Sequence, residues 1–132
     1  MRITPDTNVL VRILVEDDPI QASAAQAALV SAELVAFTLP ALCELAWVLS
    51  RSYRLSRAEI AAGIRTLINA ANASTERPAV EFGLAALDAG RDFADAVIAH
   101  EGSWLGAATF VSFDRSAVKL IEELGAAAIV LG

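Results

Sequence analysis

The strongest constraint on the fold is an alternation, along the whole chain, of short apolar runs with longer segments of helical pattern. Strands that alternate with helices are typical of a parallel sheet covered by helices on both faces. We therefore expect a single α/β domain over residues 1–132. Its architecture would be a three-layer α/β/α arrangement with a central, mostly parallel sheet of four to five strands.

The same pattern predicts where the elements lie. We expect strands at Met1–Ile3, Leu34–Leu39, Ala79–Phe82, Ala107–Phe113 and Ala126–Leu131. We expect helices after Asp6 and over Ile20–Ala32, Ala41–Tyr53, Ser56 to about Ala71, Gly83–Ala89, Asp92 to about His100, and Arg115–Leu124. The polar segment Asn72–Pro78 is predicted to be a loop.

Composition narrows the classes of function. The apolar fraction of 56% exceeds the usual value of roughly 45–50%, which indicates additional buried surface such as a subunit interface. We expect no membrane span, because charged residues interrupt every apolar run, and no signal peptide, because Asp6 follows the start almost at once. The single cysteine, Cys43, suits a reducing cytoplasm. The net charge of −6 argues against broad binding of nucleic acid, but not against a nuclease whose carboxylates hold cations.

The first candidate site lies at Pro5–Arg12, where Asp6, Thr7 and Asn8 stand between an apolar lead-in and a helical run. In open α/β sheets, ligands bind at the carboxyl ends of strands. Each of the three side chains is also a good helix N-cap. Taken alone the segment favours a cap, but three further acids at comparable positions favour a cation site.

Glu44 is the least ordinary of these acids. The residues three and four positions away from it are Pro40, Ala41, Trp47 and Val48. None of them can pair with a carboxylate on the surface of a helix. A solvated helix face is the alternative, yet this helix is apolar on nearly all sides. We therefore expect Glu44 to be half-buried or to face a cleft.

The other acids are Asp92, Asp95 and Asp114. Capping explains Asp92 as well as a functional role does, and it would explain Asp114 if that residue stood alone. Asp95 falls in the first turn of a helix, so its carboxylate can point along the carboxyl edge of the sheet toward Asp6. Ser112, two residues before Asp114, would add a hydroxyl to the same edge. Oxygen ligands without Cys or His indicate a hard cation, Mg²⁺ or Mn²⁺.

Taken in order, these motifs resemble a PIN-domain protein of the VapC toxin type. The resemblance is carried by Asp6–Arg12, the Glu44 helix, Asp92–Ala99 and Ser112–Arg115, and it covers essentially the whole chain. It implies a Mg²⁺- or Mn²⁺-dependent endoribonuclease, the toxin of a type II toxin–antitoxin system. It also implies a homodimer and a cognate VapB-like antitoxin that blocks the site. Thr4–Pro5 departs from the apolar pair usual in the family before the first Asp.

The resemblance also implies roles for individual residues. The catalytic and metal-binding acids would be Asp6, Glu44, Asp95 and Asp114, and the supporting residues would be Thr7, Asn8, Asp92 and Ser112. A metal-activated water would attack the phosphodiester, with Glu44 positioning that water or completing a second metal site. Arg12 and Arg115 are candidates for phosphate contacts, and each is equally a candidate for a surface residue or for a partner of one of the acids.

Two other classes of function stay open. A Mg²⁺-dependent phosphatase or phosphoacceptor domain would also place an Asp after its first strand, but it needs a lysine near the phosphoryl group, and Lys119 is the only lysine. The other class is a catalytically silent PIN-fold module that only binds a partner. For the assembly, we expect Trp47 either to anchor a subunit interface or to lie in the monomer core.

Overall fold

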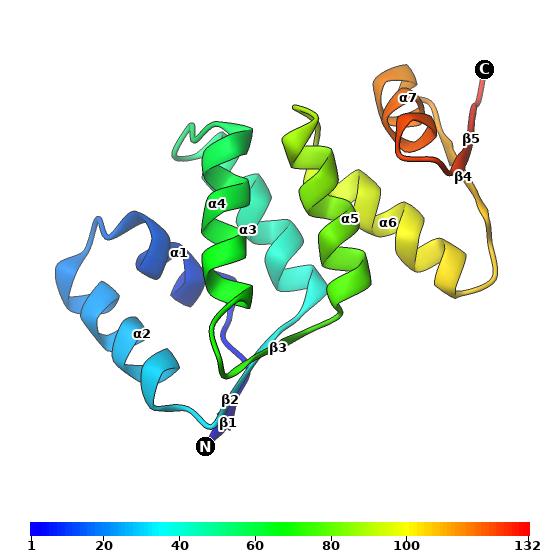
Figure 1. Ribbon diagram of the computed structural model, residues 1–132. Helices are drawn as coiled ribbons and strands as arrows, with labels where there is room; N and C mark the ends of the chain where they lie inside the picture. Colours follow the sequence, from blue (N-terminus) through cyan, green and yellow to red (C-terminus); the bar gives the residue numbers. More distant parts are fainter. The chain divides into compact units, whose positions relative to one another are not determined.

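Five strands and seven helices make up the protein, and every strand pairing is parallel. The computed structural model describes all residues 1–132 and divides them into two units, Met1–Glu76 and Arg77–Gly132. Figure 1 shows the elements of each unit. The expected α/β class with parallel strands is confirmed, with three strands in the first unit and two in the second. The organisation as a single domain stays a prediction.

The first unit contains a three-stranded sheet and four helices. The strands are β1 (Arg2–Ile3), β2 (Leu34–Phe37) and β3 (Ala73–Thr75), in the order β1-β2-β3, and the helices are α1 (Thr7–Val15), α2 (Pro19–Ser31), α3 (Leu39–Arg51) and α4 (Arg57–Ile68). Helix α1 packs against α2 and α3, and α3 packs against α4. The predicted capping box at the start of α4 is present between Ser56 and Glu59.

Helix α3, which carries Glu44, has one buried and one exposed face. Its buried side chains are Leu39, Leu42, Leu45, Ala46 and Leu49. The opposite side of the helix is exposed and includes Glu44, Trp47 and Arg51. Trp47 is 60% exposed, so the alternative that it lies in the core of the monomer is wrong. The apolar residues of α3 are thus divided between a buried face and one large exposed aromatic ring.

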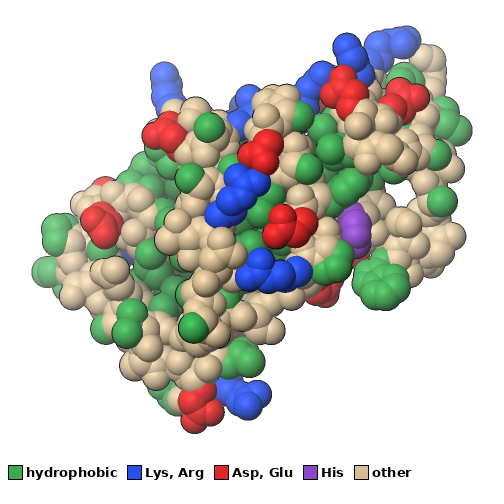
Figure 2. Space-filling model, viewed as in Figure 1, with side chains coloured by type: hydrophobic (Ala, Val, Ile, Leu, Met, Phe, Trp, Pro, Cys, Tyr) green, Lys and Arg blue, Asp and Glu red, His purple; other side chains and the backbone are tan.

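The second unit contains a two-stranded sheet and three helices. The elements are α5 (Arg77–Asp88), α6 (Phe93–Trp104), β4 (Thr109–Ser112), α7 (Arg115–Glu123) and β5 (Ala127–Val130). Helix α5 packs along α6, and α7 contacts α6 and both strands. A buried cluster of Ala86, Ala96, Leu120 and Ile121 joins these layers. The outer face of α7 carries acidic and basic side chains next to one another, at the upper right of Figure 2.

One close approach fixes α6 against α5. A Cβ atom placed on Gly83 would lie only 2.5 Å from the ring of Phe93, the buried first residue of α6. Only glycine therefore lets the start of α6 pack this closely on α5. Gly90, which follows α5, has a φ of +77° and ends that helix as predicted.

One predicted strand is wrong, and a neighbouring segment takes its place. Ala79–Phe82 belongs to helix α5, and the third strand is Ala73–Thr75, within the segment predicted to be a loop. This polar strand is short and lies at the edge of the sheet, where β2 is the only strand that pairs with it. Side chains also hold it, since Asn72 donates to the carbonyls of Leu29 and Ala32, and Thr75 donates to that of Phe37. No helix combines the length and the apolarity that crossing a membrane requires.

Candidate active site

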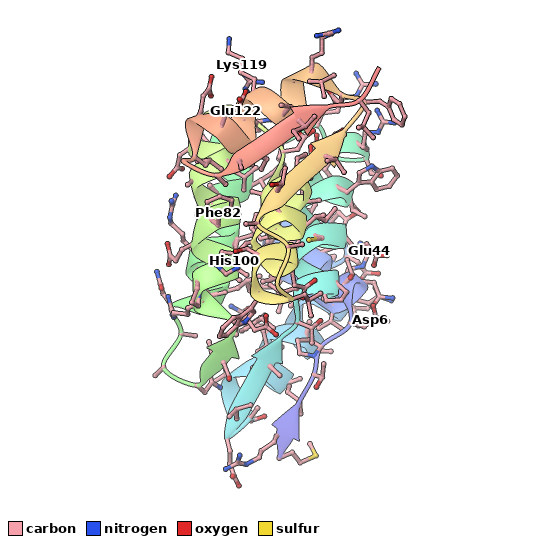
Figure 3. All side chains as sticks on the ribbon, turned by 90° about the vertical axis from the view of Figure 1, so that its right-hand side faces the viewer. Asp6, Glu44, Phe82, His100, Lys119 and Glu122 are labelled. Atoms are coloured by element: carbon pink, nitrogen blue, oxygen red, sulfur yellow. The ribbon has the colours of Figure 1, made fainter.

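In the first unit, Asp6 and Glu44 line the same open pocket, which has a volume of about 380 Å³. The pocket lies where the segments after β1 and β2 enter α1 and α3. Its other lining residues are Thr4, Pro5, Thr7, Thr38, Pro40 and Ala41. Figure 3 shows Asp6 and Glu44 near one another at the same edge of this unit. The structure therefore brings together two of the predicted acids that lie 38 positions apart in the sequence.

Asp6 occupies the N-cap position of α1 but does not cap the helix. Its backbone is extended, its carbonyl accepts the first helical hydrogen bonds, and its side chain makes no capping hydrogen bond. By contrast, Asp18, Thr38 and Ser56 each accept a backbone N–H at the start of their helices. A carboxylate that is exposed at a helix N-terminus and accepts no capping hydrogen bond keeps its oxygens available for another ligand.

Glu44 is exposed and faces this pocket from the second turn of α3. Of the two environments expected for it, half-burial and a cleft, the structure has the cleft. The start of α3 is fixed by Thr38, whose hydroxyl accepts from the N–H of Ala41 at 3.4 Å. Thr7 is buried, and its hydroxyl donates to the carbonyl of Ala41 at 3.5 Å. This contact ties the first turn of α1 to the first turn of α3, so Thr7 helps to hold the two acids at one pocket.

The other two predicted residues of this segment differ from each other. Asn8 is exposed beside the pocket-lining residues. Arg12 is occupied, since its guanidinium donates to Asp17 at 2.8 Å and to Gln21 at 2.7 Å. The hydroxyl of Tyr53 also contacts this guanidinium and, together with the charge of Asp17, raises the pKa of Arg12. Arg12 thus joins α1, the following turn and the end of α3, and its proposed contact with phosphate stays a prediction.

In the second unit, Asp92, Asp95 and Asp114 lie close enough for their charges to interact. Burial raises the pKa of Asp95, and the charges of Asp92 and Asp114 raise it further. Asp92 is the N-cap residue of α6 without a side-chain capping bond, and Asp95 lies in the first turn of that helix. The structure therefore brings together three of the predicted acids around the starts of α6 and α7.

Asp114 is a true N-cap. Its Oδ1 accepts from the N–H groups of Ser116 at 2.8 Å and Ala117 at 3.3 Å. The hydroxyl of Ser112 accepts from the N–H of Asp114 at 3.0 Å and so fixes the turn between β4 and α7. Arg115 is exposed at the first position of α7. Capping occupies one oxygen of Asp114 and leaves the other, Oδ2, outside these hydrogen bonds.

Arg91, which the sequence does not single out, helps to position this group of acids. Arg91 donates through Nη1 to the carbonyl of Ser116 at 3.2 Å and to its hydroxyl at 2.7 Å, and it pairs with Glu123 at 3.9 Å. It therefore connects the start of α6 to both ends of α7. The available signal was its position next to Asp92, but the partner in α7 lies 25 residues away and is visible only in the fold.

His100 lies in a different environment from the acids. It lines a cavity of about 140 Å³ in the second unit, together with Phe82 and other mainly apolar residues. The two rings have centroids 5.7 Å apart, and Nδ1 of His100 is buried without a hydrogen-bond partner. Figure 3 shows both residues on the paired helices α5 and α6.

The donors present suit a hard cation, because all of them are carboxylate, hydroxyl or amide oxygens. An exposed pair in one unit and a crowded trio in the other provide these oxygens. No group of three or more acidic, histidine or cysteine side chains is arranged so that it could hold one metal ion. It is thus the chemistry of the oxygen donors, and not their arrangement, that fits Mg²⁺ or Mn²⁺.

Comparison with known protein families identifies the fold. The family model described as "PIN domain" matches residues 3–123 and so includes both units and all of the acids discussed above. A search of curated proteins finds no match. PIN domains are generally nucleases, in agreement with a site built from carboxylates. The chain belongs to the PIN-domain family.

Proposed function

We propose that this protein is a Mg²⁺- or Mn²⁺-dependent endoribonuclease of the VapC toxin type. The proposal rests on the Asp6 carboxylate. Asp6 is the N-cap residue of α1, but its side chain makes no capping hydrogen bond, and it lines the same pocket as Glu44. A capping role would require the Asp6 side chain to accept a backbone N–H, as Asp18 does for α2. Within a PIN-domain chain, a carboxylate at this position that accepts no capping hydrogen bond supports a catalytic role.

The catalytic acids would be Asp6, Glu44, Asp95 and Asp114, and they would hold one or two cations. When bound, the cation would lower the pKa of a water molecule and neutralise charge on the phosphate oxygens. The crowding of Asp95 against Asp92 and Asp114 supports this assignment, because a positive charge beside them would offset their mutual repulsion.

The other residues of the chain would orient the substrate and the acids. Glu44 is exposed at the pocket and would accept a hydrogen bond from the attacking water. Thr7 and Ser112 would act through the backbone turns that they fix, next to Asp6 and Asp114 respectively. Arg12 and Arg115 would contact the phosphodiester, and Asn8, exposed two residues after Asp6 in the sequence, would support that acid. Asp92 would tune the charge felt by Asp95.

The toxin assignment adds partners and a location. We propose a homodimer, a VapB-like antitoxin that covers the acids, and a cytoplasmic protein with a reduced Cys43. Large exposed apolar side chains, including Trp104 and Leu105 at 80% and 87% exposure, support the existence of protein interfaces. Light scattering tests the dimer, since a particle of 13.8 kDa at every concentration would contradict it.

The experiment that tests the activity is incubation of the purified, partner-free protein with total RNA. We expect new RNA ends with Mg²⁺ or Mn²⁺ and none with a chelator, and the ends can be mapped by sequencing. Asp6→Asn should remove cleavage, whereas Asp18→Asn should retain it, because Asp18 caps α2 outside the pocket and asparagine caps equally well. Failure of the wild-type protein to cut any RNA with either metal would overturn the proposal.

A further inference from the structure

An exposed stripe on α3 continues from the pocket toward the end of the helix. Glu44, Trp47 and Arg51 are all exposed and are spaced by three and four residues, so they lie on one face of the helix. Trp47 lies about 4.5 Å beyond Glu44 along the helix axis, and Arg51 about 6 Å beyond Trp47, at the usual rise of 1.5 Å per residue. Any chain that leaves the pocket along α3 would meet these two side chains next.

The ring of Trp47 is held in a defined position although it is 60% exposed. The guanidinium carbon of Arg51 lies 5.7 Å from the centroid of the ring, a cation–π arrangement. Arg51 forms no ion pair with an acid. A large flat apolar surface and an uncompensated positive charge are thus presented together to solvent.

The charge of the surrounding segment is also unusual for this chain. Residues 45–58 contain three arginines and no acid, within a protein whose net charge is −6. These arginines are Arg51, Arg54 and Arg57, all exposed at the end of α3 and the start of α4. Arg54 has a positive φ of 56°, and its turn follows α3 directly. Arg51 and Arg54 therefore provide positive charge at the end of the stripe, whereas the pocket at its beginning is acidic.

We propose that Trp47 and Arg51 form a platform for an unpaired nucleotide of the RNA strand next to the cleaved phosphodiester. The base would stack on the indole ring, and Arg51, followed by Arg54, would contact the phosphates beyond it. Stacking on an aromatic ring accepts any base, so the platform would position the strand without requiring a sequence. The proposal rests on the proposed function, because it assigns the strand to the Asp6–Glu44 pocket. Trp47 would be a positioning residue that does not touch the reacting atoms.

Fluorescence tests the contact without changing the platform, because the chain has only two tryptophans. In Trp104→Phe, Trp47 is the only source of indole emission. We expect a short unstructured oligoribonucleotide, added with a chelator to prevent cleavage, to quench this emission until the site is saturated. The matched control is Trp47→Phe, in which Trp104, 80% exposed in the other unit, reports instead. Its emission should not change.

Affinity and kinetics test the consequence. Trp47→Ala should weaken binding of the labelled oligoribonucleotide by about tenfold or more, the usual effect of removing a stacked base contact. Trp47→Phe should retain most of the affinity because it keeps an aromatic ring. Trp104→Ala should bind as the wild type does. In cleavage assays the loss for Trp47→Ala should fall mainly on KM, since the acids are unchanged.

Each contrary outcome has a distinct meaning. RNA that binds by anisotropy without quenching Trp47 would overturn the platform. Unchanged RNA affinity of Trp47→Ala, together with conversion of a dimer into a folded monomer, would assign Trp47 to a protein interface instead and also overturn it. If the wild type never cuts RNA, yet RNA quenches Trp47 and Trp47→Ala weakens binding, the proposed nuclease fails and the platform stands.

Discussion

The two units place their carboxylates in different surroundings. In the first unit, Asp6 and Glu44 are exposed at an open pocket of about 380 Å³, and the side chain of Asp6 makes no capping bond. In the second unit, Asp95 is partly buried and lies near Asp92 and Asp114. Burial is the main cause that raises the pKa of Asp95, and the negative charges of Asp92 and Asp114 raise it further. Similar residues at the starts of helices thus have very different electrostatic surroundings.

The difference separates two requirements of a cation site. Exposed acids are accessible to a cation from solvent. Crowded acids concentrate charge and are destabilised until a cation or a proton arrives. In the first unit the acids are accessible, and in the second unit their crowding favours the binding of a cation.

The largest expected effect is on cleavage, where the two units should behave alike. Asp6→Asn and Asp95→Asn should each reduce the rate of RNA cleavage by at least about a hundredfold, because even indirect changes at metal sites cost about 10–100-fold. Initial rates on a labelled RNA with Mn²⁺ measure this, with Asp18→Asn as the control. A wild-type rate for Asp95→Asn would show that the crowded group has only a structural role.

Packing provides the next largest contrast. Gly83→Ala in the second unit should destabilise the protein by about 1–3 kcal/mol, because the new methyl group would overlap the buried ring of Phe93. Gly63→Ala in the first unit should be nearly neutral, because its Cβ would meet only the end of the Leu14 side chain at 3.0 Å, and alanine gains about 1 kcal/mol of helix propensity. Urea midpoints followed by circular dichroism compare the two variants. Equal midpoints would show that α5 and α6 separate readily.

Much of the fold was predictable from local chemistry. The helix starts at Pro19 and Ser56 and the glycine after α5 follow from capping and turn preferences alone. The third strand was not predictable in this way, because Ala73–Thr75 is held by pairing with β2 and by the side chains of Asn72 and Thr75. The polar sequence of Ala73–Thr75 does not by itself indicate these partners, so it does not predict a strand.

The candidate site shows the same division. Asp6, Glu44, Asp92, Asp95 and Asp114 were selected from sequence, and the structure groups them as a pair and a trio. Sequence could not show which N-cap acids actually cap, since Asp6 and Asp114 have the same local pattern. It also could not show that Arg91 joins two helices through Ser116, because that contact depends on how α5, α6 and α7 pack.

Capping gives a prediction of intermediate size that compares Asp6 with Asp114 directly. Asp114→Ala should cost about 1 kcal/mol, because the N–H groups of Ser116 and Ala117 lose their acceptor. Asp6→Ala should cost much less, since no N–H depends on that side chain. Thermal or urea unfolding without metal measures both. Asp114→Asn should recover the stability, since asparagine also caps, and an equal loss for Asp6→Ala would contradict the assignment of Asp6 as uncapped.

The smallest effect concerns the charge of Asp95 in the metal-free protein. Its pKa in the folded state is raised above the ordinary value of 3.8, first by burial and then by Asp92 and Asp114. Between the unfolded and the folded pKa the native state binds more protons than the unfolded state, so stability falls as the pH rises through the folded pKa. Asp95→Asn removes this loss and should raise the thermal midpoint at pH 7.

The pH dependence distinguishes this cause from others. The difference between Asp95→Asn and the wild type should open as the pH rises through the folded pKa of Asp95 and close below the ordinary aspartate range. Part of the gain is offset, because a negative charge in the first turn of α6 interacts favourably with the helix dipole. Added Mn²⁺ should shrink this difference by stabilising the wild type. A lower midpoint for Asp95→Asn at pH 7 would mean that the dipole outweighs crowding, and the contrast between the two units would then lie in exposure alone.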